Sequence, residues 1–260
     1  MGDLASTLAR LETRFGAQAV VRGAVAERRA GERRFPTGTA LDPILAGGIA
    51  TGAPLAFVGE GSCGVVSLAL RAVAAVQGEG GTALWIDPTA SLDPLSAAHA
   101  GVDLARLIVV RPRTRDDALL AAAAALRGDG FRAVAVDVGP ALCDRLLSID
   151  DLAPILPLVR GSTAALLVVS ERAGRRVAIP ACAFERVAWR RELGRVVGWE
   201  LVARTSRGEA RLALDAFGRT VLLNDAGRAS LGRGRGPCAS GSSLRASPLG
   251  VPSVSLRRAS

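Results

Sequence analysis

The chain has 260 residues, of which 49% are apolar, and a formal net charge of +9. This length supports one α/β core of roughly 200 residues with appendages. Arginine supplies all 33 basic residues and lysine is absent, which excludes a Schiff base or a lysine contact to phosphate within this chain. We expect a cytoplasmic protein without a membrane partner, because no apolar run of about 18 residues occurs and the first residues are unlike a secretory signal.

The N-terminal segment, residues 1–33, is predicted to be separate from the core. Apolar residues recur at helical spacing within "DLASTLARLETRFG", which predicts a short helix with one apolar stripe. The strand-like stretch "AQAVVRG" and a charged linker follow. We therefore divide the chain into this segment, a core over residues 34–225 and a tail over residues 226–260.

The core alternates apolar strands with amphipathic helices. Strands are expected at residues 54–59, 82–87, 106–112, 132–139 and 164–170, and helices at 64–80, 93–100, 115–130 and 150–160. Continuous Val, Leu, Ile and Ala in such strands is typical of a parallel sheet that is covered on both faces. After residue 184 the pattern predicts antiparallel strands that extend this sheet, with Trp189 and Trp199 as core residues.

The tail is rich in Gly, Ser, Pro and Arg, and residues 228–260 hold six arginines and no acid. This composition predicts a disordered segment, which serves either as a solubilising extension or as a contact for nucleic acid or an acidic partner. The remaining 227 residues carry 27 arginines against 24 acids, so the core itself is nearly balanced.

The four cysteines lie far apart and the chain has a single histidine. Neither a zinc site nor a disulfide framework fits this pattern, and we expect no metal and no cofactor.

The stretch "VGEGSCGVVS" places Gly59 and Gly64 at the spacing of a phosphate loop between a strand and a helix. A working loop has the pattern GxxxxGK[ST], in which the lysine reaches phosphates and the hydroxyl holds magnesium. Val65 and Val66 occupy those two positions and can do neither. The glycine spacing alone also fits any tight turn from a strand to a helix.

The surrounding residues resemble the RecA recombinase family collinearly over about residues 6–223. The resemblance is carried by "LARLETRFGAQAVVRG", "FPTGTALDPILAGGIATGAPLAFVGEGSCG", "WIDPTASLDPLSAAHAGVD" and "GFRAVAVDVGPAL". It implies a fold of the α/β class: a RecA-like P-loop core with a mostly parallel central sheet, an N-terminal helix and antiparallel C-terminal strands.

The family's active-site residues are mostly replaced. Its phosphate-loop lysine and the adjacent threonine fall on Val65 and Val66. Its catalytic glutamate falls on Thr89 in "WIDPTASLDP", and its γ-phosphate-sensing glutamine falls on Glu171. Only the Walker B carboxylate, Asp137, remains, and it also fits a hydrogen-bonded acid at the end of a strand. Because phosphoryl transfer depends on these groups, we expect a pseudo-ATPase with no catalytic residues.

The family's DNA-binding loops are shortened here. The candidate DNA-binding residues lie in the connection after the strand at 164–170 and in the antiparallel strands that follow it. They are Arg172, Arg175, Arg176, Arg190, Arg191 and Arg195. Such arginines either bind single-stranded DNA through phosphate, with a salt-dependent affinity, or line a solvated sheet edge.

Within the family the chain is most similar to the ImuA group of shortened RecA-like accessories. That resemblance implies a noncatalytic role in translesion synthesis during the SOS response, near the nucleoid. It implies as partners an ImuB-type Y-family polymerase homologue and RecA, and it allows self-association and single-stranded DNA. The partner-binding candidates are Leu8, Leu11, Phe15, Val20 and Val21. A SulA-like cell-division inhibitor and a DNA-binding recombinase paralogue remain as alternatives.

Overall fold

The computed structural model describes residues 33–139, 147–223 and 229–230. The partner-binding candidates of the N-terminal segment, and all of the tail beyond residue 230, lie outside these ranges. In the described part of the chain, no helix is both long and apolar enough to cross a membrane.

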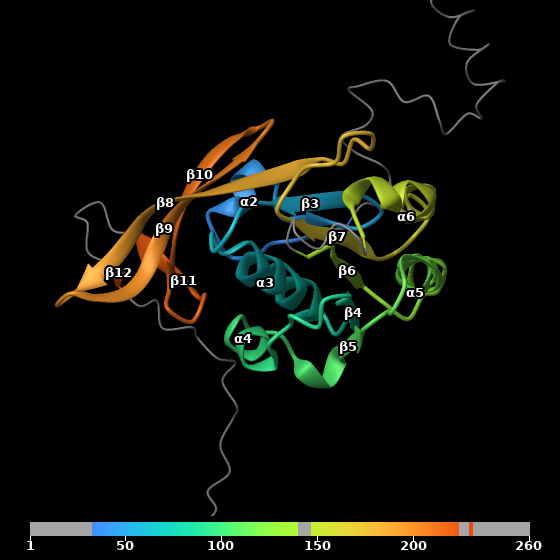
Figure 1. Cartoon of the computed structure of the whole chain (residues 1–260), viewed down its shortest axis with the longest axis horizontal. Coiled ribbons are helices and arrows are strands. Elements are labelled where there is room, and N and C mark those ends of the chain that lie inside the picture. The colour runs from blue at the N-terminus through green and yellow to red at the C-terminus, as the bar shows by residue number, and fades with distance from the viewer. Residues whose placement is uncertain (1–32, 140–146, 224–228, 231–260) are drawn as a thin grey trace, which may run out of the picture.

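One ten-stranded sheet organises the molecule, in the order β12-β11-β10-β9-β8-β3-β7-β6-β4-β5 (Figure 1). Its strands are β3 (Pro54–Val58), β4 (Ala83–Ile86), β5 (Leu107–Val110), β6 (Ala133–Asp137), β7 (Ala165–Ser170), β8 (Ala181–Glu192), β9 (Arg195–Thr205), β10 (Gly208–Asp215), β11 (Thr220–Leu223) and β12 (Ala229–Ser230). The strands from β8 to β5 in this order pair in parallel, and those from β8 to β12 pair antiparallel. The predicted fold class, a mostly parallel sheet extended by antiparallel strands, is confirmed.

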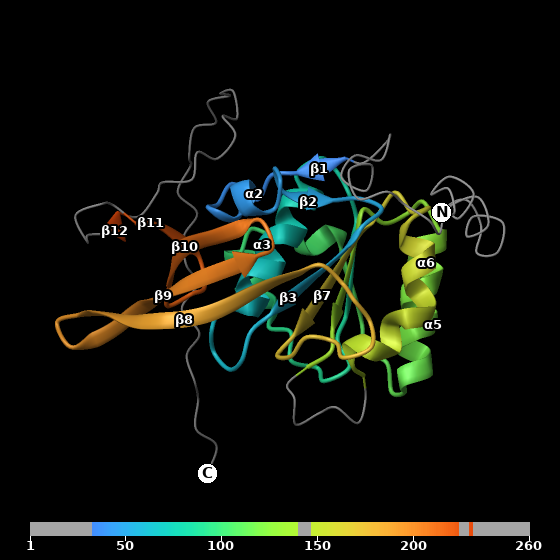
Figure 2. The same cartoon turned by 90° about the horizontal axis from the view of Figure 1, so that it is seen from above.

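Helices cover both faces of the parallel strands. On one face lie α2 (Leu41–Ile44), α3 (Val65–Gln77) and α4 (Pro94–His99), and on the other lie α5 (Arg115–Arg127) and α6 (Leu156–Val159) (Figure 2). Successive residues of a strand point to opposite faces. Leu167 and Val169 of β7 accordingly pack with α3, while Leu166 and Val168 pack with α5. Both faces are therefore apolar, as the continuous apolar runs predicted.

Several short elements lie outside the main sheet and its helices. Strands β1 (Arg34–Phe35) and β2 (Ile49–Ala50) form a separate two-stranded sheet, and the 3₁₀ turn η1 (Leu104–Arg106) leads into β5. The helix expected at 150–160 is instead the 3₁₀ segment η3 (Ile149–Ile155) followed by the single turn α6. Prolines at 154 and 157 explain this difference, because proline cannot donate the backbone hydrogen bond that a continuous α-helix needs.

The long β8–β9 hairpin projects beyond the body of the sheet (Figure 2). It turns at Leu193 and Gly194, both at positive φ. Trp189 near this end is 45% exposed, so the prediction that it is a core residue is wrong. The sequence pattern identified the strand of Trp189 correctly. It does not show where that strand extends beyond the helices and strands that would bury its side chains.

Candidate functional site

The phosphate-loop sequence forms a tight turn between β3 and α3. Gly64 takes a left-handed conformation, with φ of 92°, and α3 begins at the next residue. The backbone N–H of Gly59 donates to the carbonyl of Ser170 at the end of β7, at 3.1 Å. The loop therefore keeps the strand-to-helix geometry that its glycine spacing predicts.

The C-terminal antiparallel strands hold this loop through its backbone carbonyls. Trp199 Nε1 of β9 donates to the carbonyl of Cys63 at 3.3 Å, and Arg186 Nη1 of β8 donates to that of Ser62 at 2.7 Å. A Cβ added at Gly64 would overlap the side chain of Leu214 and lie 3.1 Å from Trp199 Nε1. The absence of a side chain at Gly64 thus lets β9 and β10 pack directly on the loop.

The two valines that follow the loop have different surroundings. Val65 is buried in the core with α3, whereas Val66 is 41% exposed and lines a pocket of about 380 Å³ beside the loop. Ser67 also lines this pocket and lies against the turn between β10 and β11, where a Cβ on Gly218 would overlap it. Neither valine offers a charge or a ligand atom to a phosphate.

The pocket brings together most of the nucleotide-site positions named from the sequence. Its wall includes Gly59, Gly64, Val65, Val66, Asp137 and Glu171. Thr89 is not on this wall; its hydroxyl donates to Ser91 Oγ at 3.1 Å. The lining also includes Trp199 and Ser91, which the sequence did not mark as site residues. Trp199 contacts a residue 136 positions away in the chain, and its strand pattern gave no sign of that contact.

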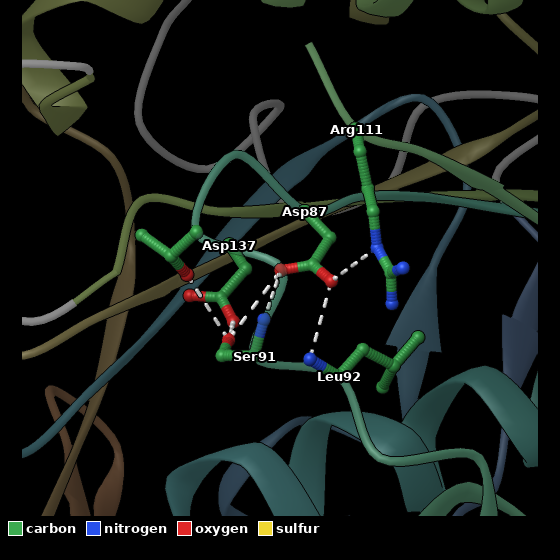
Figure 3. A network of polar contacts seen from close by, with 6 residues as sticks. Asp87, Ser91, Leu92, Arg111 and Asp137 are labelled. Carbon is green, nitrogen blue, oxygen red and sulfur yellow. Dashed lines mark hydrogen bonds and ion pairs between the residues drawn. The ribbon is translucent and has the colours of Figure 1, made fainter. Parts of the chain in front are cut away.

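Two buried carboxylates lie at the strand ends beside the pocket (Figure 3). Asp87 follows β4 and accepts hydrogen bonds from the N–H groups of Ser91 and Leu92, at 2.9 and 3.2 Å, and from Arg111 Nε at 3.4 Å. Asp137 ends β6 and accepts the N–H of Gly139 at 2.9 Å. Asp87 thus has a cationic partner, whereas the short hydrogen bond of Asp137 is to a neutral group.

Burial raises the pKa of Asp137 above its ordinary value, and the nearby Asp87 raises it further. The hydrogen bonds from Gly139 and Ser91 act in the opposite direction. Burial also raises the pKa of the Cys63 thiol within the loop. The environment beside the loop therefore disfavours added negative charge.

The arginines named as DNA-binding candidates form two groups. Arg172, Arg175 and Arg176 are exposed on the connection before β8, where the Asp150 carboxylate accepts the N–H groups of residues 175–177 at 2.8–3.1 Å. Arg190, Arg191 and Arg195 lie at the far end of the β8–β9 hairpin. A strand as long as β8 spans about 36 Å, so the two groups are not one compact patch.

Among the described residues, no three His, Cys, Asp or Glu side chains gather in a way that could hold a metal ion. The side chains nearest the loop that could meet a ligand are Asp137, Glu171 and the serine hydroxyls of the pocket wall.

A family model described as the RecA N-terminal domain matches residues 2–150. The chain belongs to the RecA family. It is similar to Protein RecA of Prochlorococcus marinus (strain MIT 9303), with 37% identity over 139 residues, and to Protein RecA of Nostoc sp., with 34% over 142 residues. These stretches cover 53% and 55% of this chain but 36% and 40% of the relatives, so the chain spans about two fifths of their length.

The RecA family match includes the phosphate loop and Asp137 but ends before β7. Glu171, which follows β7, and Trp199 of β9 therefore lie outside the matched region. The contact between Trp199 and the loop joins the region that this family model matches to strands beyond it.

We expect Trp199→Phe to destabilise the fold by about 1 kcal/mol, because the ring remains while the hydrogen bond to the Cys63 carbonyl is lost. Chemical denaturation of the full chain would measure the change. Leu120→Ala is the control, since that side chain is exposed on α5 and away from the loop, and it should change stability by less than about 0.5 kcal/mol. Equal effects of the two substitutions would contradict the role given to the Trp199 bond.

We expect Asp137→Asn to stabilise the protein at pH 8 and to have no such effect near pH 4. The folded state raises the pKa of Asp137, so the ionised carboxylate costs stability once the pH exceeds the unfolded pKa of about 3.9. Asparagine keeps the acceptor for Gly139 without the charge. Thermal unfolding at both pH values tests this, and a loss of stability at pH 8 would contradict it.

Proposed function

We propose that the chain is a noncatalytic RecA-like accessory of DNA-damage-induced translesion synthesis, similar to the ImuA group. In this proposal it binds an ImuB-type polymerase homologue, RecA or both, and it does not hydrolyse ATP. The observation that carries the proposal is the phosphate loop itself, which keeps its turn while the positions for lysine and threonine hold Val65 and Val66.

The loss of catalysis is supported at two further points. The catalytic glutamate position holds Thr89, whose hydroxyl bonds within its own turn. The sensor position holds Glu171, which brings a negative charge to the pocket wall where the family has a neutral glutamine. With no lysine anywhere in the chain, no rearrangement within it restores the phosphate contact.

An exposed edge strand supports a docking role. In the described part of the sheet β5 pairs only with β4, so its other edge presents unpaired backbone groups. Ile108 and Val109 on this strand are 47% and 38% exposed, and Leu104 just before it is also exposed. An apolar edge of this kind accepts an added strand from another chain. The N-terminal segment supplies the complementary elements in our proposal, an apolar helix followed by a strand.

Single-stranded DNA is a second partner in the proposal, through the two arginine groups, in which every member but the half-buried Arg190 is exposed. Trp189 adds an exposed aromatic ring to the group at the hairpin end, and Arg186 stacks over it with 4.1 Å between the guanidinium carbon and the ring centre. Aromatic rings beside arginines are typical of surfaces that bind single strands without sequence preference.

We expect the full chain to show no saturable ATP hydrolysis and no stabilisation by MgATP. A ligand at 100 times its Kd would raise the free energy of unfolding by about 2.7 kcal/mol, which a thermal unfolding assay detects. Protein RecA of Prochlorococcus marinus serves as the positive control. MgATP binding with saturable turnover would remove the noncatalytic assignment, whereas a rise in the unfolding midpoint without turnover would contradict only the expected loss of nucleotide binding.

We expect the tagged full chain to recover RecA or a Y-family polymerase homologue from DNA-damaged cells of its native host, after nuclease treatment. Leu11→Asp combined with Phe15→Asp should abolish recovery, because acidic side chains would interrupt the apolar stripe. Leu120→Asp, at an exposed position on α5, is the control and should leave recovery unchanged. Recovery of the division GTPase alone would instead favour a division inhibitor.

A further inference from the structure

The charged residues that line the pocket beside the phosphate loop are acidic, whereas a phosphate site is lined by basic groups. The pocket's charged lining residues among those described are Asp137 and Glu171, and no arginine of the described chain lines it. An adjoining hollow of about 410 Å³ shares Glu171 and adds Glu60 and Glu185, with Arg186 as its basic residue. In that hollow Glu185 pairs with Arg204 at 2.6 Å, and Arg186 keeps its positive charge while it donates to the Ser62 carbonyl and stacks on Trp189. The acidic lining is therefore that of the pocket itself.

Asp137 has less hydrogen bonding than its burial requires. The residue is 5% exposed, and Oδ1 accepts the Gly139 N–H at 2.9 Å. The donor recorded for Oδ2 is Ser91 Oγ, at a long 3.4 Å. The same hydroxyl also lies 3.4 Å from Asp87 Oδ1 (Figure 3). One hydroxyl carries one proton, so it cannot serve both carboxylates at once.

Asp87 already accepts from two backbone N–H groups and Arg111, so the Ser91 proton is available to Asp137. Among the described residues, this contact of 3.4 Å is the only donor to Oδ2 of Asp137, a buried carboxylate on the pocket wall. A buried carboxylate oxygen with one long hydrogen bond is poorly stabilised, and a charged donor is its strongest partner.

The shape and lining of the pocket select among cationic donors. A volume of about 380 Å³ is far larger than a metal ion needs, and the described residues form no cluster of three metal ligands. Trp199 supplies an aromatic wall, and serine hydroxyls at 62, 67 and 91 supply further acceptors. A planar guanidinium stacks on aromatic faces and donates two parallel hydrogen bonds to a carboxylate, which an ammonium does less well.

We infer that this pocket binds the guanidinium group of an arginine side chain in place of a phosphate. In the bound state Asp137 accepts from the guanidinium and Trp199 lies against its face. The inference rests on the loss of phosphate binding in the proposed function, and it adds a specific ligand class for the site. The arginine comes either from another protein or from the chain's own residues 228–260, which hold six arginines and no acid.

The test titrates the ¹⁵N-labelled full chain with N-acetyl-arginine amide and follows the backbone signals of Gly59, Gly61 and Gly64 by NMR. The neutral isostere N-acetyl-citrulline amide is the matched probe. We expect saturable shifts with the arginine compound and at least tenfold weaker binding of the citrulline compound. Equal affinity for the two compounds, or no saturable shift with either, would overturn the inference.

Substitutions locate the binding. Asp137→Asn and, separately, Glu171→Gln should each weaken binding of the arginine compound at least tenfold, with folding checked by thermal unfolding. Glu209→Gln is the control, because that acid lies on β10, does not line the pocket and pairs with Arg204 at 3.5 Å. An affinity that changes no more in the two pocket variants than in the control would overturn the inference.

A further full-length variant identifies the source of the arginine. In this variant glutamine replaces the six arginines of residues 228–260. Its affinity for N-acetyl-arginine amide should rise if the tail occupies the pocket, and should stay unchanged if the arginine comes from another molecule. A lower affinity would overturn the inference. A parallel titration with MgATP separates the two proposals. Absence of binding by both MgATP and the arginine compound removes this inference while the noncatalytic assignment stands. Binding of MgATP in the pocket removes this inference, and the noncatalytic assignment falls as well if turnover accompanies it.

Discussion

The packing of Trp199 against the phosphate loop joins the two halves of the molecule. The loop belongs to the parallel, helix-covered half, and Trp199 belongs to the antiparallel half that follows it along the chain. Its indole N–H donates to a loop carbonyl, and the bare Gly64 beside it allows β9 and β10 to approach. A loop that in the RecA family serves a ligand is here also a contact surface for the protein's own strands.

The order and type of the core elements could be predicted because each has a strong local signal. The apolar run at 165–170 lies in a strand that is buried at every position, and the run at 54–58 lies in a strand buried at Ala56 and Phe57, so their pattern and their surroundings agree. The helix at 150–160 was mispredicted because two prolines altered its hydrogen bonding. Local signals of this kind carry information about neighbours in the chain.

The residues around the phosphate loop were predictable only in part, because some of them come from distant parts of the chain. Motif spacing identified the loop glycines and the family resemblance identified Asp137; both lie at the carboxyl ends of parallel strands, which meet at one edge of a sheet. The contribution of β9 could not be seen, because its strand pattern does not reveal a partner 136 residues earlier. The same limit explains Trp189, whose exposure depends on where the hairpin leaves the sheet. Hydrogen-bond satisfaction at Asp137 likewise depends on Ser91 and Asp87, which come from another strand end.

The β8 strand links the hairpin end directly to the loop. Arg186 donates to the loop carbonyl of Ser62 and also stacks on Trp189, farther along the same strand. A molecule that displaced or rotated Trp189 would therefore alter the surroundings of the side chain that donates to the loop. One side chain of β8 thus contacts both the phosphate-loop turn and the exposed ring near the end of the hairpin.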